Sequence, residues 1–426
     1  MSEFPNLPFT LNKEKKQDGD QFLLQCLQGK LQFPYLSPET CGKISALSLE
    51  DENGDFRLLH ENLLELWPLV LTDALLELKK HDAREFDCAN PHMEEFFDPA
   101  SLGITELQQV LGGFSEFEGM MYGASPGQYR DHVAHSFRVW IIGHGLLQTS
   151  FNSSLDMHPS IEKSISPVEW QCMWAIVALC HDIGYPLSHV ERINERARGT
   201  LKKQGLMHEG SLRFRFSQQM MPFHDTIIRL IASDPVKHTE GAYFTHVQTK
   251  YYLKLLKSFD SLDHGVVSSL LISRALVYFL ESDFAYDAYK PLDSDDIRQF
   301  FIRREILRAI AAHTCQDIYH LTFNNLSLLL YMVDEIQCWG RPTLEETQHE
   351  ATNIREGYAE VERFGGHAIK VKITTHDKEW KANQQQGVLR QVLKLRRMLR
   401  LAVGRKEHLD RELEFSVWNQ GCLLYT

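Results

Sequence analysis

Apolar residues recur at intervals of three and four positions along much of the first 340 residues, and this helical period predicts a mainly α-helical protein. The N-terminal third shows the pattern most clearly over residues 62–80, where Pro68 is expected to begin a second helix or to kink the first. Residues 82–103 are rich in Asp, Asn, Pro and Phe and are expected to form a loop. We therefore assign residues 1–120 to a helical N-terminal region that serves as a scaffold or a lid.

The apolar stretch 174–180 ends abruptly at His181 and Asp182, and Gly184 and Pro186 follow, which are residue types that stop a helix. Buried polar groups need partners, so an imidazole beside a carboxylate at the end of a buried helix makes little sense as packing alone. Both groups suit a divalent transition metal, Mg²⁺ or Mn²⁺. The pattern therefore predicts two ligands to one cation.

Four further apolar stretches carry a potential metal ligand, and each is expected to form a helix. Three of them contain, begin at or end at a histidine, and the fourth, over residues 326–333, ends at Asp334. A lone carboxylate in such a stretch costs several kcal/mol unless it is paired or bound to a cation. One such histidine is more simply a packed core residue, but five helices that each present a ligand favour convergence on a cation. The predicted metal ligands are His135, His181, Asp182, His264, His313 and Asp334.

These residues resemble the motifs of the HD-domain superfamily of metal-dependent phosphohydrolases. Residue His132, three positions before His135, competes with it as the first ligand, but the His-Ser-x-Arg-Val context favours His135. The resemblance covers roughly residues 125–340 and implies an HD-type helical bundle over residues 121–345. Three segments carry it: His135-Ser-Phe-Arg-Val, Ala178-Leu-Cys-His181-Asp182-Ile-Gly and Tyr331-Met-Val-Asp334.

In the superfamily, the first histidine, the His-Asp doublet and the final aspartate hold the metal. Members with two metals add two histidines, similar to His264 and His313 here, and the aspartate of the doublet bridges the metals. A polar and basic insertion at about residues 188–260 is longer than in compact members, which leaves His208 and His224 as alternatives to His264.

The resemblance implies a metal-dependent phosphohydrolase that cleaves a phosphoester or phosphoanhydride bond in a nucleotide or a nucleotide-derived signal. We expect one or two divalent ions, and the ligands do not distinguish Mn, Fe, Mg, Zn, Co or Ni. His181 and Asp182 are the expected catalytic centre. Asp131 and Glu335 are expected to orient the imidazoles, with a solvent-facing Glu335 as the alternative. Residues that flank the motifs are expected to contact phosphate or base: Arg130, Arg138, Tyr185 and His189.

Another reaction class is compatible with the same ligands. Relatives with this ligand order hold two irons and oxidise a small organic substrate, so an HD-type diiron oxygenase is the alternative. A nuclease and a non-catalytic sensor module are further alternatives. Metal content and O₂ consumption separate hydrolysis from oxygenation.

The C-terminal region, residues 346–426, is expected to form a small α+β appendage. Residues 367–375 alternate apolar and polar side chains, which predicts a strand. Residues 388–406 predict an amphipathic helix, and from Lys381 to Lys406 there are eight basic residues and no acidic one. This basic helix is expected to dock on the acidic body of the protein, or to contact nucleic acid, nucleotide phosphates or a partner subunit.

Composition indicates a soluble, cytoplasmic protein. The net charge of −12 argues against a general polyanion-binding surface but leaves room for a local basic patch. The eight cysteines form no Cys-x-x-Cys pair, which favours a reducing compartment. Met1 to Asp20 contains no apolar segment typical of a secretory signal. The longest apolar stretch, around residues 265–280, is interrupted by Arg274, so we expect no membrane span.

Overall fold

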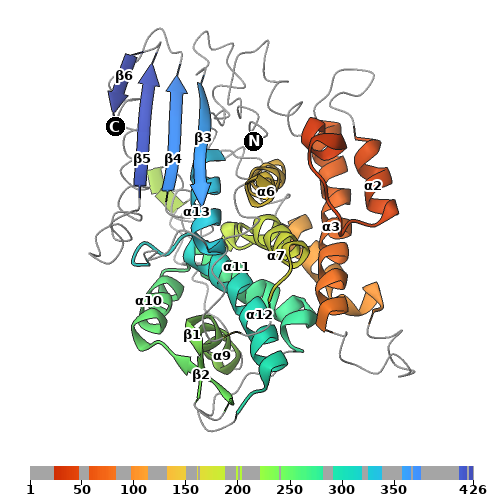
Figure 1. The fold of residues 1–426 in the computed structure, drawn as a ribbon, viewed down its shortest axis with the longest axis vertical. Helices are drawn as coiled ribbons and strands as arrows, with labels where there is room; N and C mark the ends of the chain where they lie inside the picture. Colours follow the sequence, from red (N-terminus) through yellow and green to blue (C-terminus); the bar gives the residue numbers. More distant parts are fainter. Residues whose placement is uncertain are drawn as a thin grey trace.

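A computed structural model of the chain shows a mainly helical protein, as the periodicity predicted (Figure 1). The strands that follow residue 337 are described by their backbone only. The structure describes residues 24–47, 57–82, 97–113, 132–149, 161, 164–187, 198–199, 202–203, 221–238, 241–281, 291–318, 325–337, 357–365, 368–375, 412–419 and 422–425.

The N-terminal region contributes helices α2 (Pro38–Ser45) and α3 (Arg57–Asp82). Pro68 lies inside α3, so the expectation that a second helix begins at this proline is wrong. The indole Nε1 of Trp67 donates to the carbonyl of Leu179 at 2.9 Å, which ties the middle of α3 to the central helix of the bundle. Shorter elements here are the π-helical turn η1 (Cys26–Lys30), the 3₁₀ turn η3 (Pro99–Leu102) inside the expected loop, and a helix over residues 104–113.

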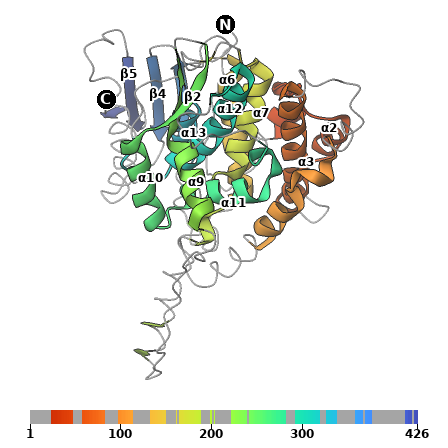
Figure 2. The same ribbon diagram turned by 90° about the horizontal axis from the view of Figure 1, so that it is seen from below.

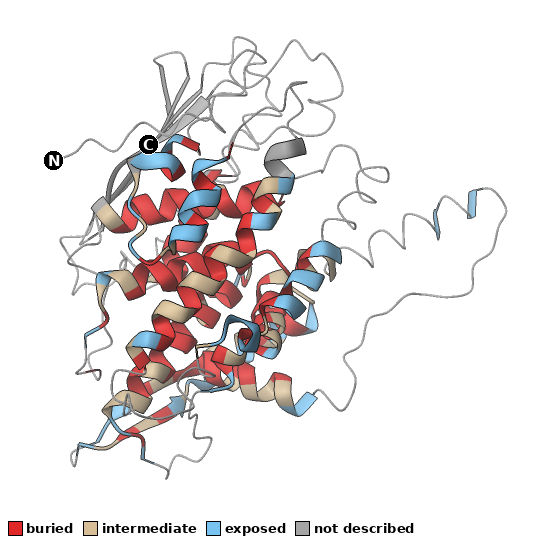
Figure 3. Ribbon diagram, turned by 90° about the vertical axis from the view of Figure 1, so that its right-hand side faces the viewer, coloured by how far each residue is buried: buried red, intermediate tan, exposed pale blue. Residues whose placement is uncertain are grey.

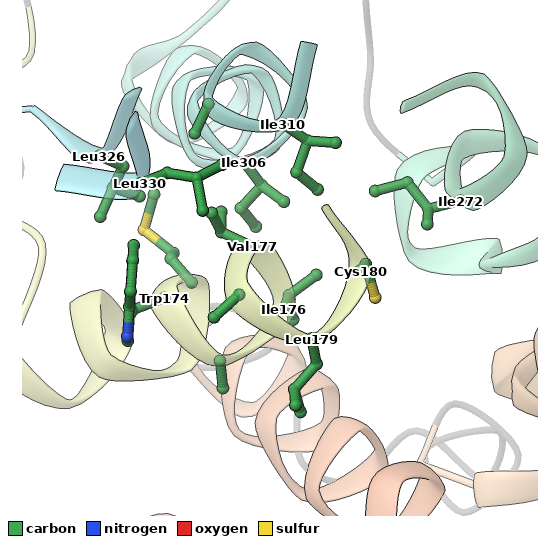
Figure 4. Packing of buried hydrophobic residues seen from close by; sticks show 14 of the residues in the cluster. Trp174, Ile176, Val177, Leu179, Cys180, Ile272, Ile306, Ile310, Leu326 and Leu330 are labelled. Carbon is green, nitrogen blue, oxygen red and sulfur yellow. The ribbon is translucent and has the colours of Figure 1, made fainter. Parts of the chain in front are cut away.

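A bundle of five helices forms the centre of the molecule. Helix α7 lies in the middle, and every residue from Glu169 to Cys180 is buried. It begins at a capping box, in which the Ser166 side chain accepts from the backbone N–H of Glu169 and the Glu169 carboxylate accepts from Ser166. Figure 4 shows its apolar side chains between those of the neighbouring helices. The five helices are α6 (His132–Thr149), α7 (Pro167–Cys180), α11 (His264–Ala275), α12 (Ser294–Ala312) and α13 (Leu326–Gln337).

One continuous buried core joins the N-terminal helices to the bundle (Figure 3). Close packing in this core requires a glycine in α6, because a Cβ on Gly143 would lie 2.0 Å from the ring of Trp174. The Trp174 indole Nε1 donates to the carbonyl of Trp140 at 2.8 Å, which fixes the ring over this glycine. Helix α3 packs directly against α6 and α7.

Residues 221–238 and 241–260 of the expected insertion fold against the bundle. They form α9 (Met221–Ala232), an antiparallel hairpin of β1 (Ser233–Lys237) and β2 (Tyr243–Val247), and α10 (Thr249–Asp260) (Figure 2). Two arginines of α12 bond to the start of β1 and hold the hairpin in place: the buried Arg304 and the half-buried Arg308, both to Asp234 and to the carbonyl of Ser233. The η6 turn (Val277–Phe279) follows α11.

The C-terminal region forms a four-stranded sheet at one end of the molecule (Figure 1). Its order is β3-β4-β5-β6, with β4 and β5 parallel and the two outer pairs antiparallel. The predicted strand is confirmed as β4 (Ala368–Thr375), whereas the three other strands were not predicted. The expected basic helix over 388–406 lies outside the described residues. The other strands are β3 (Gly357–Gly365), β5 (Glu412–Asn419) and β6 (Cys422–Tyr425).

Among the helices that the structure describes, none combines the length and the apolar character that a bilayer crossing requires.

Candidate metal centre

All six predicted ligands lie together where the five bundle helices meet. His135 comes from the first turn of α6, His181 is the C-terminal cap of α7 and Asp182 follows it. The other three stand at the start of α11, at the C-terminal cap of α12 and in the last part of α13: His264, His313 and Asp334. The cluster therefore depends on the packing of all five helices.

The first half of the cluster contains two histidines and two carboxylates. The Nε2 atoms of His135 and His181 lie 3.3 Å apart. Asp334 Oδ1 lies 3.0 Å from His135 Nε2 and 4.0 Å from His181 Nε2. Asp182 Oδ2 lies 3.7 Å from His135 Nε2 and 3.4 Å from His181 Nε2. The donor atoms of His135, His181 and Asp334 all lie within 4.8 Å of one another, so one cation could share these three.

The second half of the cluster lies on the opposite oxygen of the same carboxylate. Asp182 Oδ1 is 3.2 Å from His264 Nε2 and 3.6 Å from His313 Nε2. The rings of His264 and His313 lie with their centroids 5.1 Å apart. His181, Asp182 and His313 form a second set of donor atoms within 4.8 Å of one another, so His181 and Asp182 lie between the two ends of the cluster. Two neighbouring cations could share the Asp182 carboxylate in this arrangement.

Hydrogen bonds on the far side of three rings aim their Nε2 atoms into the cluster. The Nδ1 of His181 donates to the carbonyl of Ala178 at 2.8 Å, and the Nδ1 of His313 donates to the carbonyl of Ile310 at 2.6 Å. With the proton on Nδ1, each Nε2 presents a lone pair, as metal ligation requires.

The corresponding partner of His135 was not predicted from the sequence. Its Nδ1 bonds to the Oε1 of Gln337, a buried residue at the end of α13. The signal that could have found it is the spacing, because Gln337 lies three residues after Asp334 and therefore on the same face of the helix.

Buried polar atoms in the cluster fit a cation better than they fit one another. His313 Nε2 is buried and has no hydrogen-bond partner, and its 3.6 Å separation from Asp182 Oδ1 is too long for a hydrogen bond. A buried acceptor without a partner is costly in an apolar bundle, and a cation at this position would satisfy it. The mixed imidazole and carboxylate donors suit Mn, Fe, Zn and related ions.

Electrostatics makes the cluster attractive to positive charge. Burial lowers the pKa of His181, but the charges of Asp182 and Asp334 outweigh it and raise that pKa to about 9. Burial raises the pKa of Asp182, but the neighbouring His181, His264 and His313 hold it well below its ordinary value. Burial lowers the pKa of His313, so that this ring is neutral. A divalent cation would replace the proton that the two carboxylates hold on His181, so metal binding by this ring would release a proton.

Two glycines allow the helices to approach closely enough for the cluster to form. A Cβ on Gly184 would lie 2.6 Å from the carbonyl oxygen of His264, and a Cβ on Gly265 would lie 2.6 Å from that of Ile310 and 3.0 Å from the His313 ring. Ser268 Oγ accepts from the backbone N–H of Gly184 at 2.8 Å and fixes the chain just after the His-Asp doublet.

Two histidines that competed with the predicted ligands lie outside the cluster. His224 is buried in α9 with its ring centroid 5.5 Å from that of Phe259. His132 has its ring centroid 6.5 Å from that of His135, but packs more closely, at 4.2 Å, against Tyr185. The third competitor, His208, lies outside the described residues.

The predicted substrate and orienting residues have mixed positions. Tyr185 is half-buried at the edge of the cluster, with its ring centroid 5.4 Å from that of His264. Arg138 is half-buried on α6, one turn after His135. Glu335 is buried, so the solvent-facing alternative is wrong, but its role as an orienting group stays a prediction. Three of these residues lie outside the described part of the chain: Arg130, Asp131 and His189.

Comparison with known proteins gave no match to a family model, to a curated protein or to a solved structure. What the fold and the cluster define is therefore a class of site: a buried histidine and carboxylate centre in a helical bundle, with donor groups that could hold a metal ion.

Proposed function

We propose that this protein is a metal-dependent phosphohydrolase that cleaves a phosphoester or phosphoanhydride bond, and that its substrate is a nucleotide or a nucleotide-derived signal. The observation that carries the proposal is the position of Asp182, whose Oδ2 lies near His135 and His181 and whose Oδ1 lies near His264 and His313. The resemblance of the ligand segments to those of HD-domain phosphohydrolases supports the same reading.

The proposed reaction depends on divalent ions and on the residues that hold and orient them. Divalent ions held by the cluster would lower the pKa of water and neutralise the charge of a phosphoryl group. Asp182 holds the two groups of ligands together, and the Nδ1 bonds of His135, His181 and His313 keep their Nε2 atoms aimed inward.

Substrate is expected to approach from the side of His264. Its side chain is 25% exposed and that of Asp334 is 22% exposed, whereas those of His135, His181 and His313 are almost completely buried, so the open edge of the cluster includes both His264 and Asp334. The half-buried ring of Tyr185 lies beside it and could stack on a base or a sugar. Contacts from Arg130, Arg138 and His189 to phosphate stay predictions.

Hydrolysis of a panel of nucleotides and cyclic dinucleotides, followed by phosphate release or by chromatography of the products, tests the proposal. We expect turnover that a chelator abolishes and Mn²⁺ restores. Asp182→Asn should remove activity, and His224→Gln is the matched control because it alters a buried histidine outside the cluster. A wild-type protein that binds metal and cleaves none of these substrates would contradict the proposal.

The second candidate is a diiron oxygenase acting on a small organic substrate. Four imidazoles and two carboxylates also suit a pair of irons, which is the observation that favours it. Iron in the purified protein together with substrate-dependent O₂ consumption would favour oxygenation over hydrolysis.

A further inference from the structure

The two helices that end at the metal centre also share a buried ion pair at their other ends. Helix α7 carries Glu169 in its first turn, and α12 carries Arg298 in its second turn. The guanidinium of Arg298 donates to Oε1 of Glu169, and the two side chains are only 10% and 1% exposed. Both helices therefore run in the same direction, from this ion pair to the cluster.

At the C-terminal ends of α7 and α12, next to the metal centre, each histidine ring is bonded to its own helix. His181 and His313 are the C-terminal caps of α7 and α12, and each Nδ1 bonds to the carbonyl three residues earlier. Because each ring is bonded to its own last turn, an axial shift of either helix moves the ring with it. The position of α7 along α12 thus sets the position of Asp182 relative to His313.

Indole hydrogen bonds tie α7 to α3 and α6, and the ion pair ties it to α12. Glu169 is the only charged residue of α7, and every side chain from Glu169 to Cys180 is buried. A helix that is apolar on all sides has no polar face to define its rotation or its axial position. The ion pair supplies what the apolar surface lacks, because any shift of α7 along α12 separates two buried charges.

Further bonds anchor this pair within the bundle. Glu169 Oε2 accepts from the backbone N–H of Ser166 at 2.8 Å, so the carboxylate is held by its own helix terminus. On the side of α3, Asp82 accepts from Arg303 at 3.0 Å and lies 4.0 Å from Arg298. The Glu169–Arg298 pair is thus a fixed point rather than a mobile surface contact.

We propose that Glu169 and Arg298 are positioning residues for the metal centre. They lie about 18 and 22 Å from the ligands at a helical rise of about 1.5 Å per residue over 12 (181 − 169) and 15 (313 − 298) residues. They act by fixing α7 against α12, and this inference rests on the proposed two-metal centre.

The proposal predicts an asymmetric effect on the two cations. The group of His135, His181, Asp182 and Asp334 comes from α6, α7 and α13, and contains no ligand of α12. The group on the other oxygen of Asp182 contains His313 of α12. Loss of the ion pair should therefore weaken the cation beside His313 much more than the other one.

Titration of the full chain with Mn²⁺, followed by electron paramagnetic resonance, tests this directly, because two adjacent Mn²⁺ ions give an exchange-coupled signal. In Glu169→Gln and Arg298→Met, we expect the second Mn²⁺ to bind about 10–100-fold more weakly, the range for residues that orient metal ligands. The first Mn²⁺ should bind almost as in the wild type. Arg298→Lys keeps the cation and should restore most of the second affinity.

Two further variants separate positioning from stability. In Glu169→Met with Arg298→Met, an apolar pair replaces the ion pair, and such replacements often preserve stability; we expect a folded protein that still binds the second Mn²⁺ weakly. Lys79→Met is the control, since it removes a cation that is even more buried than Arg298, that lies on α3 and that pairs with Glu281.

The outcomes are distinct. A wild-type protein that binds no Mn²⁺ would overturn the proposed metal centre itself. A wild-type protein that binds two Mn²⁺, with Glu169 and Arg298 variants that bind both equally well or lose both equally, would overturn only the positioning role. Loss of the second ion in the Lys79 control to the same extent would also overturn it.

Discussion

Substitution of Gly265 by alanine tests whether close approach of α11 and α12 builds the cluster. The added Cβ would lie 2.6 Å from the carbonyl oxygen of Ile310 and 3.0 Å from the ring of His313, whereas ordinary contact begins at 3.4 Å. Helix α11 would therefore have to move by about 0.8 Å (3.4 − 2.6) away from the backbone of α12. Such a shift exceeds the tolerance of about 0.2 Å in metal–ligand distances.

The expected loss of stability follows from two opposing effects. Overpacking against a rigid backbone costs about 3 kcal/mol, the upper end of its usual range. Alanine gains about 1 kcal/mol over glycine in a helix, so the net loss is about 2 kcal/mol. Gly42→Ala is the matched control: it lies inside α2 with no atom within 4 Å of the added Cβ. It should stabilise the protein by about 0.5–1 kcal/mol.

Urea unfolding of the two variants and of the wild type measures both effects, and a Mn²⁺ titration of Gly265→Ala measures the cluster. We expect opposite signs for the two substitutions and weaker Mn²⁺ binding for Gly265→Ala alone. If Gly265→Ala is as stable as Gly42→Ala and binds Mn²⁺ like the wild type, the close approach of α11 does not build the site.

Three further predictions concern single contacts. Gln337→Met removes the bond that aims His135 and should weaken binding of the first cation about 10–100-fold, as measured by Mn²⁺ titration; unchanged affinity would contradict the role of this glutamine. Burial lowers the pKa of His144 to about 4, so the folded protein keeps this ring neutral at pH values where the unfolded chain, with a pKa near 6.5, binds a proton. The free energy of unfolding of the wild type should therefore fall by about 3 kcal/mol between about pH 6.5 and 4. Urea unfolding of His144→Gln across this range should lack that decrease. Trp67→Phe removes the bond to Leu179 and leaves a buried carbonyl unpaired, which should cost about 1–3 kcal/mol in urea unfolding; a neutral effect would argue against the contact between α3 and α7.

Much of the helical fold could be predicted from local pattern, because apolar periodicity reports which face of each helix is buried. The helical period of residues 62–80 predicted a helix, and these residues lie within α3. The pattern did not predict that this helix continues through Pro68. Packing of α3 on α6 and α7 supports a helix across a residue that an isolated helix would not tolerate.

The cluster could be anticipated because a polar side chain in an apolar stretch is conspicuous in one dimension. The arrangement of the ligands around the two oxygens of Asp182 could not be predicted, because it depends on how five helices cross. The Glu169–Arg298 pair illustrates the same limit: it joins residues 129 positions apart, and each looks like an ordinary helix-end charge in the sequence. Three strands of the C-terminal sheet were missed because strand pairing is non-local and their alternation is short.

A crystal structure of the protein with Mn²⁺, in which anomalous scattering locates the ions, tests whether the cluster holds two cations. We expect two peaks about 2.2 Å from opposite oxygens of Asp182, one also beside His135, His181 and Asp334 and the other beside His264 and His313. Crystals soaked to saturation that show no peak within reach of Asp182 would contradict this expectation.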